Sequence, residues 1–112
     1  MNKVDRAPRR HLIHVVKIKT SNGSEFAGRL VDISESGIKM ITKEKVFIGD
    51  TYRLEISIPE TIDNSKEIIC RGTVVWYRHH LNPERYSAGF EMEGVDKENQ
   101  SLLNKLIDSF MN

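Results

Sequence analysis

Hydrophobic and polar residues alternate along most of the chain with a period of two, which is typical of β-strands that bury one face. The clearest run is residues 51–59, in which Tyr52, Leu54 and Ile56 fall on one face and mostly polar residues on the other. Similar runs, rich in β-branched residues, predict about six strands, at residues 11–20, 26–34, 38–42, 51–59, 66–78 and 86–92. Turn signals separate these runs, so we expect antiparallel pairing.

The pattern changes to a helical period near the C-terminus. The apolar residues there follow i, i+3, i+4 spacing, which indicates a helix with one apolar stripe: Leu102, Leu103, Leu106, Ile107, Phe110 and Met111. Asp96 stands before the stripe and is the predicted N-cap. The stripe is expected to pack against an open end or an edge of the strands, with docking of a partner as the alternative.

Six short antiparallel strands followed by one helix predict an all-β domain with a single C-terminal helix, built as a small split β-barrel. Asn22-Gly23 supports this, because both residues tolerate positive φ and so favour a hairpin after the first strand. The expected organisation is a flexible basic arm at 1–11, a barrel at 12–95 and the helix at 96–112.

Length and composition indicate one domain of a soluble globular protein. The chain has 112 residues, with 38% hydrophobic and 29% charged residues. Cys70 is its one cysteine, which excludes an internal disulfide framework and fits a reducing compartment. No run is long and apolar enough for a signal peptide or a membrane span. We therefore expect a cytoplasmic protein.

The positive charge of the chain is concentrated at its N-terminus. The net charge is only +1, yet residues 1–11 hold four cations and one carboxylate, a local charge of +3: Lys3, Arg6, Arg9, Arg10 and Asp5. Such a local cationic segment suits a small anionic ligand better than a long nucleic acid, which would call for a broadly basic surface.

Two short motifs supply the candidate chemistry. The first is "RAPRR" at residues 6–10, and the second is "DISESG" at residues 32–37. Asp32 and Ser34 are two positions apart, so on a strand they project from the same face. Gly37 is expected to allow a sharp turn and a close approach to the backbone. Together they suggest a pocket with acceptors on one wall and the basic arm closing over it.

In these motifs the chain resembles a single-domain member of the PilZ family, the bacterial receptor module for cyclic di-GMP. Arg6 and Arg10 match an R-x-x-x-R arm, and "DISESG" matches a [D/N]-x-S-x-x-G turn about 20 residues later. Further on, "GTVVWYR" and "YSAGFEM" are similar to the late strands of the family, with Met92 where the family often has Phe.

The resemblance implies a receptor without enzymatic activity, cofactor or metal, which signals through a downstream effector protein in motility, exopolysaccharide export or virulence. The ligand-binding residues it implies are Arg6, Arg9, Arg10, Asp32, Ser34 and Gly37. Arg9 either reaches a second ligand molecule or points at solvent. The family accommodates one ligand or a stacked pair, and the sequence does not decide between them.

The chemistry of these residue types agrees with that ligand. Guanidinium groups bind phosphate in a bidentate manner and also pair with the Hoogsteen edge of guanine. A carboxylate such as Asp32 can accept from the N–H donors on the other edge of guanine, and Ser34 can add a hydroxyl contact. A flexible arm that becomes ordered only with ligand would change a surface that a partner protein reads.

Simpler interpretations stand beside these. The arginines alone are typical of a solvated tail, and Asp32 and Ser34 of turn chemistry. Trp76 and Tyr86 are expected in the core, with base stacking as the alternative. Cys70 is expected in the core. The histidines lack ligand spacing, so no metal site is expected: His11, His14, His79 and His80. The competing functions are a ligand-independent protein-interaction module and a small barrel that binds single-stranded RNA, while an enzyme is least supported.

Overall fold

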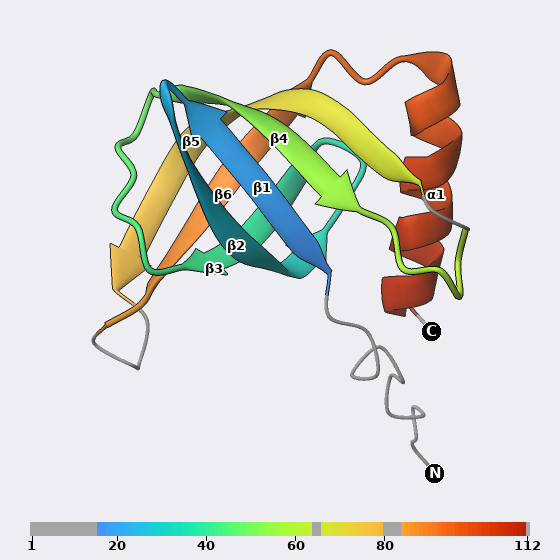
Figure 1. The fold of residues 1–112 in the computed structure, drawn as a ribbon, viewed down its shortest axis with the longest axis horizontal. Coiled ribbons are helices and arrows are strands. Elements are labelled where there is room, and N and C mark those ends of the chain that lie inside the picture. Colours follow the sequence, from blue (N-terminus) through green and yellow to red (C-terminus); the bar gives the residue numbers. More distant parts are fainter. Residues whose placement is uncertain (1–15, 64–65, 80–83, 112) are drawn as a thin grey trace, which may run out of the picture.

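The computed structural model describes residues 16–63, 66–79 and 84–111. Within them, six strands precede one helix: β1 (Lys17–Asn22), β2 (Ser24–Ile33), β3 (Gly37–Thr42), β4 (Thr51–Ser57), β5 (Glu67–His79), β6 (Tyr86–Glu93) and α1 (Lys97–Met111). All pairings are antiparallel, and the strands close into a barrel in the order β1-β2-β3-β6-β5-β4 (Figure 1). The predicted fold class, a small antiparallel β-barrel with one C-terminal helix, is confirmed.

The first hairpin forms where the sequence predicts it. Asn22 and Ser24 are the last paired residues of β1 and β2, and Gly23 between them has a φ of +85°. Glycine adopts this left-handed conformation without the steric cost that a Cβ atom imposes. The predicted first strand at residues 11–20 begins in the structure at Lys17, and residues 11–15 lie outside the described residues.

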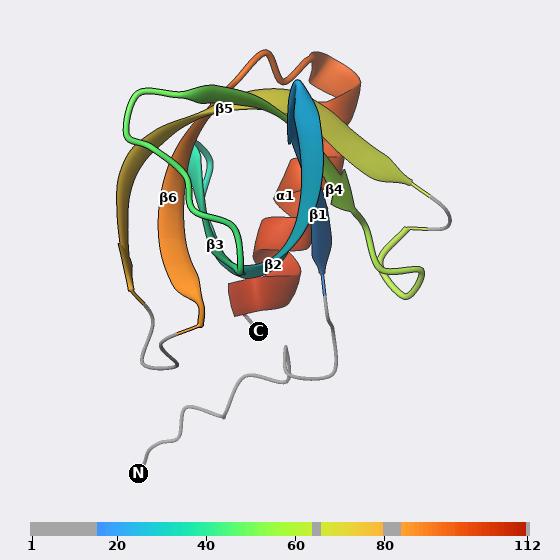
Figure 2. The same cartoon turned by 60° about the vertical axis from the view of Figure 1, so that its left-hand side comes forward.

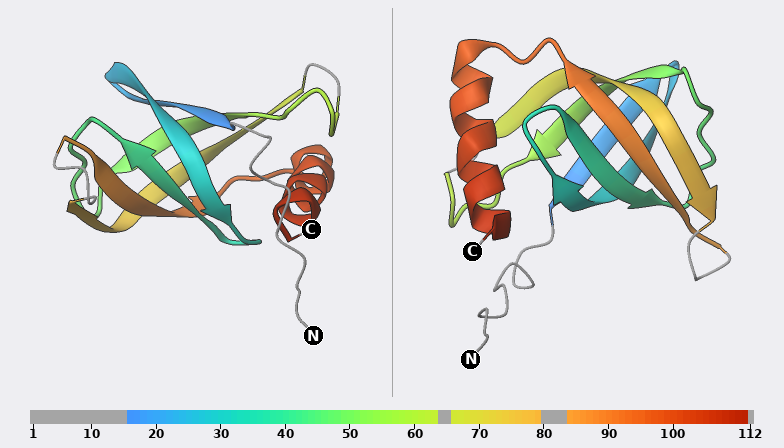
Figure 3. Two further views of the ribbon diagram at one scale, coloured as in Figure 1. Left: turned by 90° about the horizontal axis from the view of Figure 1, so that it is seen from below. Right: turned by 180° about the vertical axis from the view of Figure 1, so that it is seen from behind.

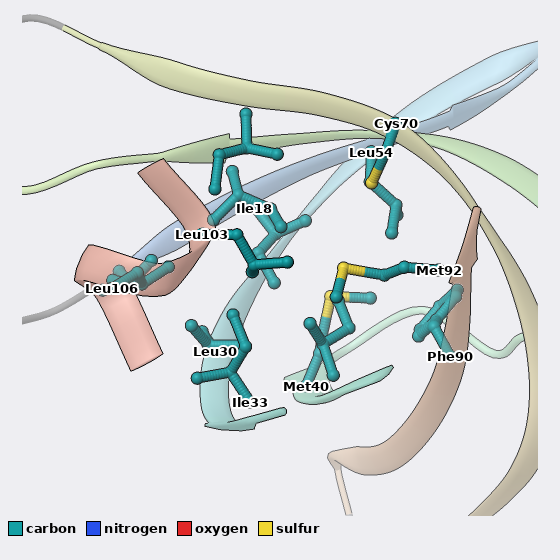
Figure 4. Packing of buried hydrophobic residues seen from close by; sticks show 14 of the residues in the cluster. Ile18, Leu30, Ile33, Met40, Leu54, Cys70, Phe90, Met92, Leu103 and Leu106 are labelled. Carbon is teal, nitrogen blue, oxygen red and sulfur yellow. The ribbon is translucent and has the colours of Figure 1, made fainter. Parts of the chain in front are cut away.

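Alternate side chains of the strands fill the inside of the barrel. Ile18, Leu54 and Ile56 are fully buried, and Leu54 and Ile56 follow the alternation predicted for residues 51–59. Cys70 is also buried in this cluster, as predicted (Figure 4). Burial of each such aliphatic side chain contributes roughly 1.5–3 kcal/mol, so the barrel interior is the main source of stability.

A β-bulge interrupts the alternation of β2 near its end. The register with β3 shifts between Leu30 and Asp32. Leu30 and Ile33 point into the core, whereas Val31 and Asp32 are both exposed. A bulge places two consecutive residues opposite one partner, so both can lie on the outer surface. The bulge thus delivers the Asp32 carboxylate to the outside of the barrel.

A second bulge interrupts β5 and corrects one prediction. The register with β6 shifts between Val74 and Trp76, and Val75 is 47% exposed. Simple alternation puts Trp76 on the buried face with Val74, and that prediction is wrong because the bulge reverses the alternation. Trp76 instead lies on the outer surface, and Tyr77 turns inward and packs against the core.

Helix α1 covers one end of the barrel. Leu103 and Leu106 are fully buried, and the helix packs mainly against β5 and also against β2 (Figures 2 and 4). Asp96 is the N-cap, as predicted, because its Oδ1 accepts a hydrogen bond of 2.8 Å from the Asn99 N–H. The apolar stripe therefore packs on the barrel, as predicted, rather than facing a partner. Among the described residues, no helix has the length and apolarity that crossing a membrane requires.

Candidate ligand-binding site

β3, β6 and β5 form the wall of the barrel that faces the viewer in the right-hand panel of Figure 3. A pocket of about 360 Å³ opens on the outside of this wall. The turn between β2 and β3 supplies one side, and the bulge of β5 supplies the other. The lining residues are Asp32, Ile33, Ser34, Ser36, Gly37, Ile38, Lys39, Val75, Trp76, Gly89, Phe90 and Glu91. Three predicted site residues, Asp32, Ser34 and Gly37, thus lie together in one cavity.

The Asp32 carboxylate is fixed at one oxygen and open at the other. The Ile33 N–H donates a 2.9 Å hydrogen bond to Asp32 Oδ1. No ion pair joins Asp32 to a cation among the residues that the structure describes, and the side chain is exposed. Turn chemistry is thus compatible with a binding role, since the local bond holds Oδ1 and leaves Oδ2 free to accept from a ligand.

The turn that follows is pinned to the neighbouring strand. The Ser34 N–H donates to the Gly37 carbonyl at 2.9 Å, and the Ser34 hydroxyl lies 3.4 Å from the same oxygen. The Met92 N–H donates to the Ser36 carbonyl at 2.8 Å, which ties the turn to β6. This weak contact of the Ser34 hydroxyl leaves it available to a ligand.

Gly37 has one of the two roles expected of it, the close approach to the backbone. The described glycines with positive φ are Gly23, Gly49 and Gly94, so Gly37 does not use the left-handed region to make the turn. A Cβ atom at Gly37 would instead stand 3.0 Å from the Phe90 carbonyl oxygen. The glycine is needed because β3 and β6 approach closely at the floor of the pocket.

Trp76 forms the wall opposite the turn, and a glycine makes this possible. Gly89 is the cross-strand partner of Trp76, and a Cβ atom on Gly89 would overlap the indole Nε1. The indole can therefore lie against the bare backbone of β6. Sequence reasoning assigned Trp76 to the core, and the signal that could have corrected this is the glycine at the centre of "SAGFE" on the partner strand.

Two cations flank the indole. The Arg78 Cζ lies 4.8 Å from the ring centroid of Trp76, and the Lys39 Nζ lies 6.0 Å from it. Lys39 also lines the pocket and pairs with Gly89 in the register of β3 and β6. Sequence reasoning missed both cations. The strand register shows that Lys39 reaches Trp76 across Gly89, whereas Arg78 is two positions from Trp76 on β5 and was missed because Trp76 was assigned to the core. The pocket thus combines a carboxylate and hydroxyl side with an aromatic, cationic side.

Arg6, Arg9 and Arg10 lie outside the described residues, so the structure does not place them. The described chain does fix where the arm is attached. The Leu30 N–H donates to the Val16 carbonyl at 2.9 Å, and the antiparallel register pairs Lys17 with Arg29. Followed back toward its N-terminus, β1 points to the end of β2 that carries the Asp32 bulge.

Other candidate chemistry is weak among the described residues. No group of three or more His, Cys, Asp or Glu side chains in residues 16–63, 66–79 and 84–111 is arranged to hold a metal ion. Burial raises the pKa of the Cys70 thiol to about 11, so the thiol is protonated at neutral pH and is not a nucleophile. Tyr86 lies outside the pocket and packs edge-on against Tyr77, with 6.2 Å between ring centroids.

Three solved structures share the fold at low sequence identity. The inhibitor of motility MotI (DgrA) of Bacillus subtilis matches with a TM-score of 0.73 and 18% identity, covering 85% of this chain and 46% of that chain. The PilZ domain of YcgR from Escherichia coli, solved with c-di-GMP, matches with a TM-score of 0.69 and 15% identity, covering 89% and 84%. MrkH of K. pneumonia in its apo state matches with a TM-score of 0.72 and 16% identity, covering 98% and 52%.

The chain spans about half the length of MotI and of MrkH. No curated protein matches the sequence significantly. The family model for the PilZ domain matches residues 5–109, a range that includes every residue of the "RAPRR" and "DISESG" motifs. This match extends over nearly the whole chain, and the barrel agrees with the solved PilZ structure. The chain belongs to the PilZ domain family.

Proposed function

We propose that the chain is a non-enzymatic receptor for cyclic di-GMP, which it binds in the pocket between the β2–β3 turn and Trp76. PilZ domain proteins are receptors of this kind rather than enzymes. The observation that carries the proposal is the pairing of two walls in one cavity: Asp32 and Ser34 on one side and Trp76 on the other. A volume of about 360 Å³ is within the usual range of small-molecule sites.

Asp32 and Ser34 would select guanine. Oδ1 of Asp32 is already held by the Ile33 N–H, so Oδ2 faces the ligand in a fixed orientation. A carboxylate oxygen accepts the N–H donors of guanine, whereas adenine presents no such pair on that edge. The hydroxyl of Ser34 adds one more polar contact. Each well-formed base contact contributes roughly 1–3 kcal/mol of discrimination.

Trp76 would stack on a guanine, and its neighbouring cations would meet phosphate. Stacking of a base on an aromatic side chain contributes about 1–3 kcal/mol. Arg78 and Lys39 lie 4.8 Å and 6.0 Å from the indole centroid, so a stacked guanine brings its phosphates near positive charge. Because Gly89 supports the indole from the strand below, the stacking surface is already formed before ligand arrives.

The arm at residues 1–11 would supply the remaining ligand contacts and the signal. Arg10 is six residues before Val16, and six residues of extended chain reach roughly 20 Å. Arg6 and Arg10 can therefore reach a ligand beside Asp32. Guanidinium groups bind phosphate in a bidentate manner, and Arg9 is available to a second ligand molecule. Ordering the backbone costs roughly 1–2 kcal/mol per residue, which ligand binding must offset.

The ordered arm would present a new surface to an effector protein in motility or exopolysaccharide regulation. MotI, whose fold this chain shares, is described as an inhibitor of motility. The free, buried thiol of Cys70 supports a reducing cytoplasm as the place of action.

Isothermal titration calorimetry with cyclic di-GMP tests the proposal directly. Saturable binding is expected for the native chain, with loss of at least about tenfold in affinity for Arg6→Ala, Arg10→Ala and Asp32→Ala. Glu35→Gln is the matched control, because Glu35 belongs to the same exposed turn and does not line the pocket. Arg53→Ala controls for loss of a surface arginine, since Arg53 pairs with Glu55 at 3.2 Å on another wall.

Cyclic di-AMP, GMP and single-stranded RNA complete the series. Cyclic di-AMP is expected to bind at least tenfold more weakly, because it lacks the donors that Asp32 reads. No response to cyclic di-GMP would favour a ligand-independent interaction module. Salt-dependent binding of RNA of any sequence would favour the small RNA-binding barrel. Either result would remove the receptor function.

A further inference from the structure

A second cavity, of about 620 Å³, lies over β1, β2, β3 and the start of β6. It shares no lining residue with the first pocket. Its lining residues are Lys17, Glu25, Phe26, Ala27, Gly28, Arg29, Ile41, Thr42, Lys43, Glu44 and Arg85. Four of these are cations, Lys17, Arg29, Lys43 and Arg85, against two carboxylates, Glu25 and Glu44, and Glu25 is paired with Lys19 outside the cavity. We call the cavity the basic groove.

Two of the cations stand in an arrangement that is unfavourable without an anion. Lys17 and Arg29 are direct cross-strand partners on the exposed face of β1 and β2. Like charges directly opposite each other on a sheet destabilise the pair. The next outward lysine on β1, Lys19, is instead paired with Glu25 at 3.4 Å and with Glu55 at 3.8 Å. No described carboxylate forms an ion pair with Lys17 or Arg29.

The other two cations form the opposite rim. Lys43 follows Ile41 by two residues, and Ile41 is the cross-strand partner of Arg29. Arg85 comes directly before Tyr86, the partner of Thr42. Neither Lys43 nor Arg85 has an ion pair with a residue that the structure describes. The floor between the two rims is apolar where Ile41 and Ala27 line it.

We propose that the basic groove binds a carboxylate-rich, extended segment of a partner protein. Diagonal neighbours on a sheet stand roughly 7–8 Å apart, and Lys43, one residue beyond the end of β3 at Thr42, continues toward the position diagonal to Arg29. Alternate side chains of an extended peptide repeat at roughly 6.6–6.8 Å, so two glutamates separated by one residue would match this spacing. The chain's own arm does not suit the groove, because residues 1–11 carry a net charge of +3.

The position of the groove links it to the receptor function, on which its regulatory meaning rests. Lys39 lines the ligand pocket from β3, and Lys43 lines the groove directly after the end of the same strand. Lys17, on the groove, is the first residue of β1 and so stands where the arm joins the barrel. An arm drawn toward Asp32 by ligand changes the positive potential beside the groove, so the acidic partner segment would sense the ligand.

Fluorescence anisotropy with a labelled decapeptide of alternating glutamate and threonine tests the groove. Saturable binding is expected, weakened at least about tenfold by Arg29→Glu and by Lys43→Glu. Lys66→Glu and Lys97→Glu are the controls, since both residues are exposed and line neither cavity, and they should change the affinity by less than about twofold. The same peptide with lysine in place of glutamate should not bind.

Equal losses in the groove and control variants would overturn the proposal, because they would show binding to net charge alone. Absence of saturable binding would overturn it as well. So would tighter binding of single-stranded RNA or of anionic vesicles, or a dimer in sedimentation that Arg29→Glu dissolves, since each assigns the groove to another occupant. Calorimetry with cyclic di-GMP separates the two functions. The Arg29→Glu variant should bind the dinucleotide with unchanged affinity. A native chain that binds the peptide but not the dinucleotide would refute the receptor function and leave the groove proposal standing.

Discussion

Trp76 lies against Gly89 on the outer face of the barrel, in a space that a Cβ atom on Gly89 would occupy. The indole therefore depends on a missing side chain for its position beside the pocket. Substitution of Gly89 by alanine is expected to displace the indole and to weaken cyclic di-GMP binding by at least about tenfold, with the barrel retained. Trp76 is the one tryptophan of the chain, so its emission spectrum reports the displacement directly. An unchanged spectrum together with unchanged affinity would contradict this position for the indole.

Removal of the indole separates binding from stability. Trp76→Ala is expected to lose the stacking contribution, about 1–3 kcal/mol or roughly 5–150-fold in affinity. The free energy of unfolding should change little, because Trp76 lies outside the core. Trp76→Phe is the matched variant and should restore part of the affinity. Calorimetry measures the affinity and urea titration of the same samples measures the free energy of unfolding. A large loss of stability would show that Trp76 belongs to the core instead.

Helix α1 is expected to contribute strongly to stability through its buried stripe. Leu106 is fully buried, so Leu106→Ala should lower the free energy of unfolding by about 2–5 kcal/mol. Ser101→Ala on the exposed side of the same helix should change it by less than about 0.5 kcal/mol. Urea unfolding followed by circular dichroism gives both values. Equal effects would mean that the helix does not depend on its contact with the barrel.

The N-cap of α1 predicts a pH dependence of stability. Hydrogen bonds from the backbone and side chain of Asn99 hold the pKa of Asp96 below its ordinary value of 3.8. A lowered folded-state pKa means that the stabilisation is present above pH 3.8 and is lost as the pH falls through the folded-state value. Asp96→Asn keeps a capping oxygen without the charge. Its unfolding midpoint should therefore fall less than that of the native chain between pH 7 and acid, measured in urea.

The arm is expected to gain order when ligand binds. Amide hydrogens of residues 5–15 should exchange more slowly in the presence of saturating cyclic di-GMP, because the arginines would hold the backbone over the pocket. Asp32→Ala is the control, since it removes the ligand contact without touching the arm. Hydrogen-exchange mass spectrometry resolves this segment. Equal protection with and without ligand would remove the switch while leaving binding itself to be judged by calorimetry.

The sequence was sufficient for the succession of six strands along the chain, the first hairpin and the helix, because each depends on local periodicity or on a local signal such as Gly23 or Asp96. It was not sufficient for the side of the barrel on which Trp76 lies. A bulge adds one residue to a strand without a mark in the hydrophobic pattern, so Trp76 was assigned to the same face as Val74. Lys39 was missed because cross-strand neighbours follow from register rather than from spacing along the chain, and Arg78, two positions from Trp76, was missed because Trp76 was assigned to the core.

The candidate turn was found because its motif is contiguous, and its residues share a pocket as the motif implies. Of the two reasons expected for its glycine, the close approach to the backbone holds, and a turn with positive φ does not. Gly37 permits the approach of the Phe90 carbonyl from β6, a contact between residues 53 positions apart in the sequence that no local rule reveals.

Closure of the barrel restricts how the chain can communicate. Each of the six described strands is hydrogen-bonded to a neighbour on both sides. A partner therefore cannot attach by extending a sheet, and copies of the chain cannot polymerise through exposed strand edges. Recognition has to rely on side chains and turns of the outer wall, which can be altered by a small molecule while the hydrogen-bonded framework stays unchanged.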